Sequence, residues 1–485
     1  MSERLRARDL AFLTAETATT PMHNATVEIF DPRSSGFDHD TLVQLIADRI
    51  AFVPRYRQRV RWVPGHLANP VWVDDPHFDL GYHVRRSALP RPGTMDQLRE
   101  LVARIVSRPL DRSRPLWEVY FVEGLEGGRV AVLSKAHLAL VDGAQIVDLA
   151  QVLLDRKPQR RVLGSDDWRP GRPVSSTGLL LEAVRDTAGS PSTALETVRG
   201  ATDAWWRGAD AATRRVGTVV NALANRRSEQ DSPIGGTLSQ QRRFVTVRRP
   251  LAEHRAVRDA HGGTVNDVIL ATVTGALRGW LMTRAESLGG LRQVRALVPV
   301  SVHDAELEPT SLGTQIAPHF VDLPVGEPSP VVRLHQVSYS FKAHKDTGRA
   351  VAASRIAGIS GFAPSTFHAI GSRVAAAELR RGFQLSVTNV PGPQSPLYAA
   401  GAVMEQTYPV PPLLPGHALA IGVTSYDGSV FYGVTADRDL VPDAEMFGVC
   451  LGEALDELLE TAGDGRPKVP RGRSRKPARK PSGTP

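Results

Sequence analysis

The first 155 residues alternate between hydrophobic patterns typical of helices and patterns typical of strands. Residues 40–50 have a helical pattern, and the runs 116–123 and 129–135 have the composition of buried strands. A further helical face, with apolar residues at i, i+3, i+4 and i+7, is formed by Ile146, Leu149, Ala150 and Leu153. The pattern predicts one α/β unit over residues 1–155.

The patterning changes after this unit. Residues 156–240 contain polar, Pro- and Gly-bearing stretches on either side of the largely helical segment 177–227, so they are predicted to form a linker with helices. α/β patterning resumes near residue 241 with a long helix that starts near Val265. Strands are expected at 294–302, 384–388, 419–425 and 430–435, and a last helix carries Leu451, Leu455, Leu458 and Leu459.

These patterns predict an α/β fold, of the two-layer α+β kind, in which two halves are joined by a helical crossover. The expected division is 1–155, 156–240, 241–462 and a tail of 463–485. A chain of 485 residues is long enough for two or three domains with ample core. Ligand pockets form preferentially between such halves, so a functional site is expected there.

The net charge of +8 belongs to the tail alone. Residues 466–485 contain eight basic residues and no acidic one, and without them the chain carries 51 basic and 51 acidic residues. A Pro-rich basic tail cannot pack a core, and it either solubilises the chain or is attracted to an anionic membrane face or to nucleic acid. Nucleic acid is the weaker partner, because no aromatic residues are interleaved with the basic ones.

The single cysteine, Cys450, lies in an apolar helical pattern, so no disulfide framework is available and a reducing, cytoplasmic location is expected. No run reaches the roughly 18 uncharged residues that a transmembrane helix needs, and membrane contact is therefore expected to be peripheral. The histidines are scattered and no Cys cluster or HxxxH spacing occurs, so no metal site is predicted.

The stretch KAHLALVDG carries the most suggestive chemistry. It places His137 just past a buried strand and Asp142-Gly143 where a helix is expected to start. A histidine in such a place can act as a general base if a partner holds it in one tautomer and aims it at the substrate.

Three other stretches are ordinary when taken alone. Pro115, Leu116 and Trp117 precede a strand, and Trp117 is most simply a packing residue. Asn266 and Asp267 begin a helix, where such residues cap free backbone N–H groups. A strand is expected to end at Asn389 and to turn through the following Pro-Gly pair, Pro391 and Gly392.

In this order and spacing the chain resembles the bacterial wax ester synthase/diacylglycerol acyltransferase family over roughly residues 5–460. The resemblance is carried by FLTAETATTPMHNATVEIFDP, Pro115-Leu116-Trp117, the 137–143 stretch, Asn266-Asp267, LVPVSVHD, Asn389-Val390-Pro391-Gly392-Pro393 and YDGSVFYGVTADRDLVPD.

The resemblance implies a fold similar to CoA-dependent acyltransferases and peptide-synthetase condensation domains, with a tunnel between two halves. It implies transfer of a fatty acyl group from acyl-CoA, the co-substrate, to diacylglycerol or a long-chain alcohol, with no bound cofactor. It also implies that Asn266 and Asp267 hold a helix start against the cleft and that the 115–117 stretch shapes the acyl pocket.

The family motif is His-His-x-x-x-Asp-Gly, in which the second histidine deprotonates the acceptor hydroxyl and the aspartate anchors the loop. Anchored on Asp142 and Gly143, the first histidine corresponds to His137 and the second to Leu138. Shifting the register by one would place four residues between His137 and Asp142 and would turn the imidazole away from the cleft. A missing general base costs on the order of 10²–10⁴-fold in rate.

Two routes could still supply a base: His137 could reorient, or His303 or His319 could reach the substrate from the other half. The chain also reads Gly313-Thr314 where family members usually carry Gly-Asn. Two hypotheses follow, an O-acyltransferase of the family type and a catalytically impaired homologue that binds lipid or acyl-CoA. The second could lie at a membrane or lipid-body surface through the basic tail. Condensation-type transfer on carrier-bound substrates is weaker, because no carrier-like segment appears.

Overall fold

The structure is a computed structural model, and the residues it describes cover most of both predicted halves. They are 3–66, 68–140, 153–160, 168–171, 175, 177–179, 181, 234–284, 293–302, 315–345, 372–374, 376, 378 and 382–463. Most of the predicted linker, the basic tail and the motif residues Asp142 and Gly143 lie outside these ranges, as do His303, Gly313 and Thr314.

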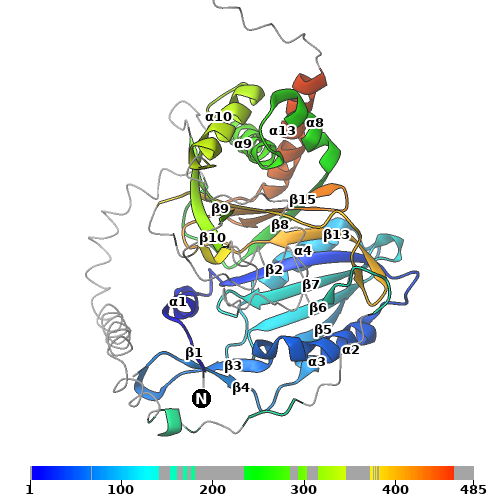
Figure 1. The fold of residues 1–485 in the computed structure, drawn as a ribbon, viewed down its shortest axis with the longest axis vertical. Coiled ribbons are helices and arrows are strands. Elements are labelled where there is room, and N and C mark those ends of the chain that lie inside the picture. The colour runs from blue at the N-terminus through cyan, green and yellow to red at the C-terminus, as the bar shows by residue number, and fades with distance from the viewer. Residues whose placement is uncertain are drawn as a thin grey trace, which may run out of the picture.

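The N-terminal half is built on a six-stranded sheet (Figure 1). Its order is β12 (Tyr398–Ala399), β13 (Ala402–Val410), β2 (His23–Asp31), β7 (Val130–His137), β6 (Trp117–Glu123) and β5 (Val84–Ala88). Only β5 and β6 pair in parallel. A three-stranded sheet lies beside it, in the order β1 (Glu3–Arg4), β4 (Val71–Asp74) and β3 (Gln58–Arg61).

Helices cover both faces of the N-terminal sheet. The covering helices are α2 (His39–Arg49), α3 (Leu80–His83) and α4 (Met95–Val106), whereas α1 (Ala7–Ala15) lies beside the sheet, near the start of β2 (Figure 1). α3 packs on the face that carries Trp117, since the ring of His83 stacks on the Trp117 ring. α4 lies on the opposite face, because the amine of Lys135, one residue from the Trp117 partner Ala136, reaches the Ile105 carbonyl.

The C-terminal half has a second six-stranded sheet with helices on one face (Figure 1). Its order is β10 (Gln315–Leu323), β9 (Val294–Val302), β11 (Leu385–Pro391), β14 (Leu419–Tyr426), β15 (Ser429–Asp437) and β8 (Arg242–Pro250). β11 runs parallel to β9 and to β14. The covering helices are α8 (Leu251–His261), α9 (Val265–Thr283), α10 (Pro330–Lys345) and α13 (Ala444–Gly463).

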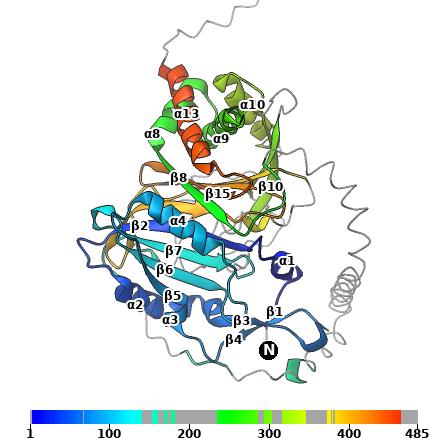
Figure 2. The same ribbon diagram turned by 180° about the vertical axis from the view of Figure 1, so that it is seen from behind.

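Most predicted elements are confirmed, but two expectations need correction. β11 continues through Pro391, so Asn389 lies inside a strand rather than at the start of a Pro-Gly turn. Residues 398–410 do not remain with the C-terminal half: β13 pairs along β2 in the N-terminal sheet. Figure 2 shows this crossing from behind, with α4 between the two sheets.

Two glycines allow β13 to pass over the C-terminal sheet. Gly422 in β14 and Gly433 in β15 are direct cross-strand partners. A Cβ atom on Gly433 would lie 1.7 Å from the Pro409 carbonyl oxygen, and one on Gly422 would lie 2.6 Å from the Pro409 Cβ. The close approach of the two sheets therefore depends on the missing side chains at this pair.

Candidate active site

His137 is the last residue of β7, where the strand is held on both sides. Its register partner on β2 is His23, and its backbone N–H donates to the Leu116 carbonyl at 2.9 Å. The chain then turns, because the Leu140 N–H donates back to the His137 carbonyl at 2.9 Å. His137 is therefore the last residue of the strand, whereas the sequence had placed it just past the strand.

The imidazole of His137 is completely buried. Its Nδ1 accepts a hydrogen bond from the Ala139 backbone N–H at 3.0 Å, so the neutral ring carries its proton on Nε2. Nε2 lies 3.7 Å from Oε2 of Glu16. Burial lowers the pKa of His137, and the nearby Glu16 carboxylate opposes this shift only in part. In this geometry both ring nitrogens face protein groups, and neither presents a lone pair to a substrate.

Glu16 is the charged partner of this histidine. Its side chain is 3% exposed, and it accepts hydrogen bonds from the Arg112 guanidinium and from the Met22 backbone N–H at 3.1 Å. Burial alone would raise the pKa of Glu16, but His137, Arg112 and Met22 together lower it to about 2. The carboxylate is therefore charged at neutral pH and faces His137 Nε2 at 3.7 Å, a charge contact that is longer than a hydrogen bond.

The C-terminal end of α4 accepts hydrogen bonds from two polar side chains that lie near His137 in the sheet. The Lys135 amine donates to the Arg108 carbonyl at 2.6 Å and to the Ile105 carbonyl at 3.2 Å, and His23 Nε2 donates to the Val106 carbonyl at 2.9 Å. These donors satisfy carbonyl groups that a helix end leaves without partners. Burial lowers the pKa of Lys135 to about 8 and lowers that of His23 well below its usual value.

Leu138 lies on a different, apolar side. Its backbone N–H donates to the Met22 carbonyl at 2.8 Å, and its side chain is fully buried. It belongs to an apolar cluster that draws residues from both halves; its buried members are Phe12, Met22, Leu138, Leu297, Phe383 and Leu414. We call this group the inter-half cluster.

The 115–117 stretch adjoins His137 through its backbone but serves the N-terminal core. Trp117 is 1% exposed, and its indole N–H donates to the Tyr56 carbonyl at 2.7 Å. Its ring stacks on His83 at a centroid distance of 4.5 Å. This supports the packing interpretation of Trp117, while a contribution of Pro115 and Leu116 to an acyl pocket stays a prediction.

Two of the other predicted residues come together across 123 positions of sequence. The Asn389 side-chain amide donates to Oδ1 of Asn266 at 2.8 Å. The cap of α9 is Thr264, which forms a capping box with Asp267. The capping role expected for the Asn266-Asp267 pair therefore belongs to Asp267 with Thr264, and Asn266 instead ties α9 to β11.

This amide pair does not face Leu138. Within β11, Asn389 lies on the same face as Leu385 and Val387, which pack in the helix-covered core of the C-terminal half. Ser386 is paired with Leu297, a member of the inter-half cluster, and so faces the other way. The pair and Leu138 therefore lie on opposite faces of the C-terminal sheet.

The structure also places His319 away from Leu138. Its neighbour Phe320 packs against the inter-half cluster, so His319 points to the opposite face of β10. There its ring lies 4.6 Å from that of Phe341 in α10. The expectation that His319 could reach a substrate beside Leu138 is not supported by this geometry.

Several residues that contact His137 or Leu138, or lie beside them, carried no recognisable signal in the sequence. Glu16 and His23 lie within the FLTAETATTPMHN stretch, but no spacing linked them to His137, which follows more than 100 residues later. Asp9 and Arg373 form a buried ion pair beside Leu138 from positions 364 residues apart. Such pairs arise from tertiary packing, which a single sequence does not display.

Within the described residues, no helix is long and apolar enough to cross a bilayer. In the same part of the chain, no three His, Cys, Asp or Glu side chains converge as metal ligands would.

Comparison with solved structures defines the class of protein. A wax ester synthase/diacylglycerol acyltransferase from Marinobacter aquaeolei VT8 matches 95% of this chain and 100% of its own, with a TM-score of 0.63 and 26% identity. The first condensation domain of the CDA synthetase matches 96% of this chain and 97% of its own at a TM-score of 0.53, and at 14% identity it shows the fold alone. The fold is therefore the two-half α/β architecture that these proteins share.

Sequence comparison gives the family. The wax ester synthase/diacylglycerol acyltransferase catalytic domain model matches residues 5–269, and the C-terminal domain model of the same family matches residues 312–459. "Probable diacyglycerol O-acyltransferase tgs1" of Mycobacterium tuberculosis strain H37Rv is 32% identical over 459 residues, which cover 94% of this chain and 95% of the relative. "Probable diacyglycerol O-acyltransferase tgs3" of the same strain is 40% identical over 261 residues, 53% of this chain and 96% of the relative. The chain belongs to the wax ester synthase/diacylglycerol acyltransferase family.

Proposed function

We propose that this protein is an acyl-CoA-dependent O-acyltransferase that esterifies diacylglycerol or a long-chain alcohol. The observation that carries the proposal is the match of both family domain models, the catalytic-domain model to residues 5–269 and the C-terminal domain model to residues 312–459. In the reaction the acceptor hydroxyl oxygen attacks the thioester carbonyl, an ester bond forms and the carbon–sulfur bond breaks. The hydroxyl proton must pass to a base, and CoA leaves as its thiol.

Position 138 determines how fast this reaction runs. In the family motif the second histidine is the base, and the residue in that place here is Leu138. Leucine accepts no proton, and the neighbouring His137 is held by Ala139 and faces Glu16. Because general-base catalysis contributes roughly 10²–10⁴-fold, acyl transfer by this chain is slow.

A second function is supported by the burial of Leu138. The leucine packs in the inter-half cluster, so the place of the base is filled by apolar contacts and the fold is not weakened there. A homologue of this kind binds acyl-CoA or lipid between its halves without turning it over.

The basic tail supports a location for either function. Residues 466–485 carry eight positive charges and no negative one, which attract anionic membranes or lipid-body surfaces. Sedimentation with vesicles containing phosphatidylglycerol should pull down the full chain and lose the chain that ends at Gly463. Equal binding by both chains would contradict a role for the tail.

The proposal is tested by transfer of radiolabelled acyl groups from long-chain acyl-CoA to diacylglycerol and to hexadecanol. The wild type, Leu138→His and His137→Ala are compared, and Leu138→Gln serves as a polar control that lacks a titratable group. We expect weak turnover by the wild type and an increase of roughly 100-fold or more for Leu138→His alone.

Each outcome has a defined meaning. A silent wild type with an active Leu138→His favours the binding function and an intact scaffold. Loss of wild-type turnover in His137→Ala, while Leu138→His gains nothing, would show that His137 has become the base. Silence of every variant with both acceptors, despite binding of acyl-CoA, would contradict acyl transfer to these alcohols.

A further inference from the structure

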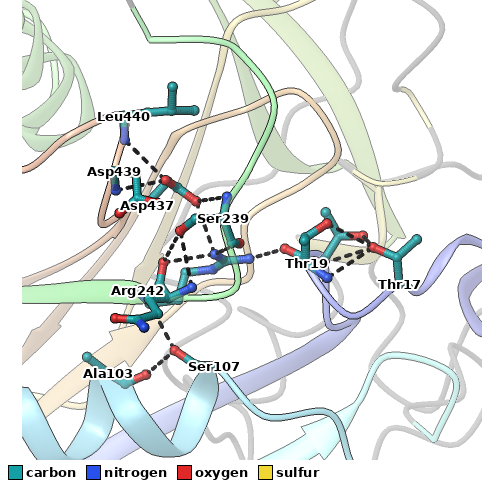
Figure 3. A network of polar contacts seen from close by, with 11 residues as sticks. Thr17, Thr19, Ala103, Ser107, Ser239, Arg242, Asp437, Asp439 and Leu440 are labelled. Carbon is teal, nitrogen blue, oxygen red and sulfur yellow. Dashed lines mark hydrogen bonds and ion pairs between the residues drawn. The ribbon is translucent and has the colours of Figure 1, made fainter.

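The C-terminal half reaches into the surroundings of His137 and Leu138 through two buried arginines. The first is Arg242, at the start of β8, whose side chain is 3% exposed (Figure 3). Its guanidinium donates to Asp437 at 3.2 Å, to the Ser239 carbonyl at 2.8 Å and to the carbonyl of Thr19 in the N-terminal half. Its backbone N–H donates to the Ser107 hydroxyl at the end of α4.

Thr19 belongs to a tight turn that precedes β2. The Thr17 and Thr20 hydroxyls bond each other at 2.6 Å, and the Thr20 N–H donates to the Thr17 hydroxyl at 3.1 Å. Figure 3 shows Arg242 joining this turn to the C-terminal half. The turn is thus closed by its own hydrogen bonds and is held in addition by a residue of the other half.

The two ends of this turn hold the motif. On one side Glu16 lies against His137 Nε2 and also accepts the Met22 N–H. On the other side the Met22 carbonyl accepts the Leu138 N–H at 2.8 Å. A shift of the turn therefore moves the partners of both His137 and Leu138.

The second arginine contacts the motif directly. Arg373, whose side chain is 8% exposed, donates to the Leu138 carbonyl at 3.1 Å and forms an ion pair with Asp9 in α1. Its guanidinium carbon lies 5.1 Å from the ring centre of Phe12, another member of the inter-half cluster. The backbone of Leu138 is consequently fixed from the N-terminal half by Met22 and from the C-terminal half by Arg373.

We propose that Arg242 and Arg373 are positioning residues, which make the geometry of residues 137–138 depend on the contact between the halves. The proposal rests on the proposed function, since position 138 is where the family's base would act. Both guanidinium groups donate to backbone carbonyls of the opposite half, a geometry that fixes position as well as charge. Reacting groups must be held to within a fraction of an ångström, so such contacts control rate.

A matched arginine distinguishes positioning from simple stabilisation. Arg333 is also buried, pairs with Glu457 and donates to the Glu327 and Pro328 carbonyls at 3.0 Å, but all of these partners lie in the C-terminal half. Its replacement removes a buried guanidinium and its carbonyl contacts without touching the motif, and it leaves Glu457, whose side chain is 44% exposed, without its partner.

The test is the ring ¹⁵N signal of His137 in full-length protein labelled on histidine, assigned with His137→Gln. The wild type should give the pattern of a neutral Nε2–H tautomer. Arg242→Met and Arg373→Met should shift or broaden this signal, and Arg242→Lys and Arg373→Lys should restore it in part. Arg333→Met should lower the melting temperature and leave the signal unchanged.

Turnover gives an independent reading in the Leu138→His background. There, Arg373→Lys should lower kcat by roughly tenfold or more while KM changes little, since the contact orients position 138 and does not bind substrate. The proposal is overturned if the four Arg242 and Arg373 variants keep the wild-type His137 signal, or if Arg333→Met disturbs it equally. The signal needs no turnover, so silence of the wild type and of every variant in the acyl-transfer assay would reject the proposed function and leave this test standing.

Discussion

Two adjacent residues, His137 and Leu138, have opposite surroundings although only one peptide bond separates them. His137 faces the charged Glu16 and a backbone N–H, whereas Leu138 packs among apolar side chains of both halves. The sequence places the leucine where the family motif has its base, and it left His137 as a candidate base only if its imidazole reorients. It could not predict Glu16 as the partner, because that contact joins residues 121 positions apart.

Glu16 gives a prediction for the pH dependence of stability. Its folded-state pKa of about 2 lies below the ordinary value of 4.5, so its stabilising effect is present above pH 4.5 and is lost as the pH falls towards 2. Glu16→Gln should lower the free energy of unfolding at pH 7 by on the order of 3 kcal/mol and flatten its dependence between pH 5 and pH 2. Denaturant unfolding at several pH values measures both effects.

The control for this prediction is Glu123→Gln, which removes a carboxylate that pairs with the largely exposed Arg86. Surface pairs of this kind contribute little to stability. If Glu123→Gln changes the acid limb of the stability curve as much as Glu16→Gln does, the assignment of that limb to the buried Glu16 carboxylate is wrong.

At the scale of elements, strand periodicity explains both what was predicted and what was missed. The apolar runs of β6, β7, β9, β14 and β15 were evident because buried strands are rich in branched apolar residues. The end of β11 was misplaced because Pro391 suggested a turn, although β9 pairs with β11 only at residues 385–386 and Pro391 is therefore paired on one side alone. The pairing of β13 with β2 was missed because register between distant strands leaves no local pattern.

The glycine pair under β13 supports a prediction about this crossing. Gly433→Ala would place a Cβ atom against the Pro409 carbonyl and should destabilise the protein by roughly 3 kcal/mol or more, or prevent folding. Thermal unfolding and the soluble yield measure this effect. Gly452→Ala in α13 is the control: its Cβ would lie 3.7 Å from the Arg249 guanidinium, and helix propensity predicts a neutral or stabilising effect. Similar losses in both variants would contradict the role of the crossing.

At the start of α9, helix capping and the contact with β11 depend on different residues, so their contributions can be measured separately. Thr264→Ala removes the cap and should cost about 1 kcal/mol by itself. Asn266→Ala and Asn389→Ala remove one shared hydrogen bond, so their double-mutant cycle should give a coupling of about 0.5–1.5 kcal/mol. Additive effects at Asn266 and Asn389, measured by denaturant unfolding, would show that the bond contributes nothing.

At the scale of the whole molecule, the two-half α/β fold could be predicted and is confirmed by the match to the Marinobacter enzyme. What the sequence did not reveal is how strongly the halves depend on each other. β13 crosses into the N-terminal sheet, Arg242 and Arg373 reach across to the motif surroundings, and the inter-half cluster surrounds Leu138. These contacts join distant positions through tertiary packing, and a single sequence encodes them without any periodic signal.

The most direct test is the dependence of kcat/KM on pH for Leu138→His and Leu138→Gln, measured with acyl-CoA and diacylglycerol. If position 138 is where the base acts, Leu138→His should exceed Leu138→Gln by roughly 100-fold or more. Its rate should also rise with pH as the imidazole loses its proton, and because burial lowers histidine pKa values the rise should fall within about pH 4.5 to 6.5. Equal rates for the two variants, or a Leu138→His rate that is flat across this range, would contradict the account.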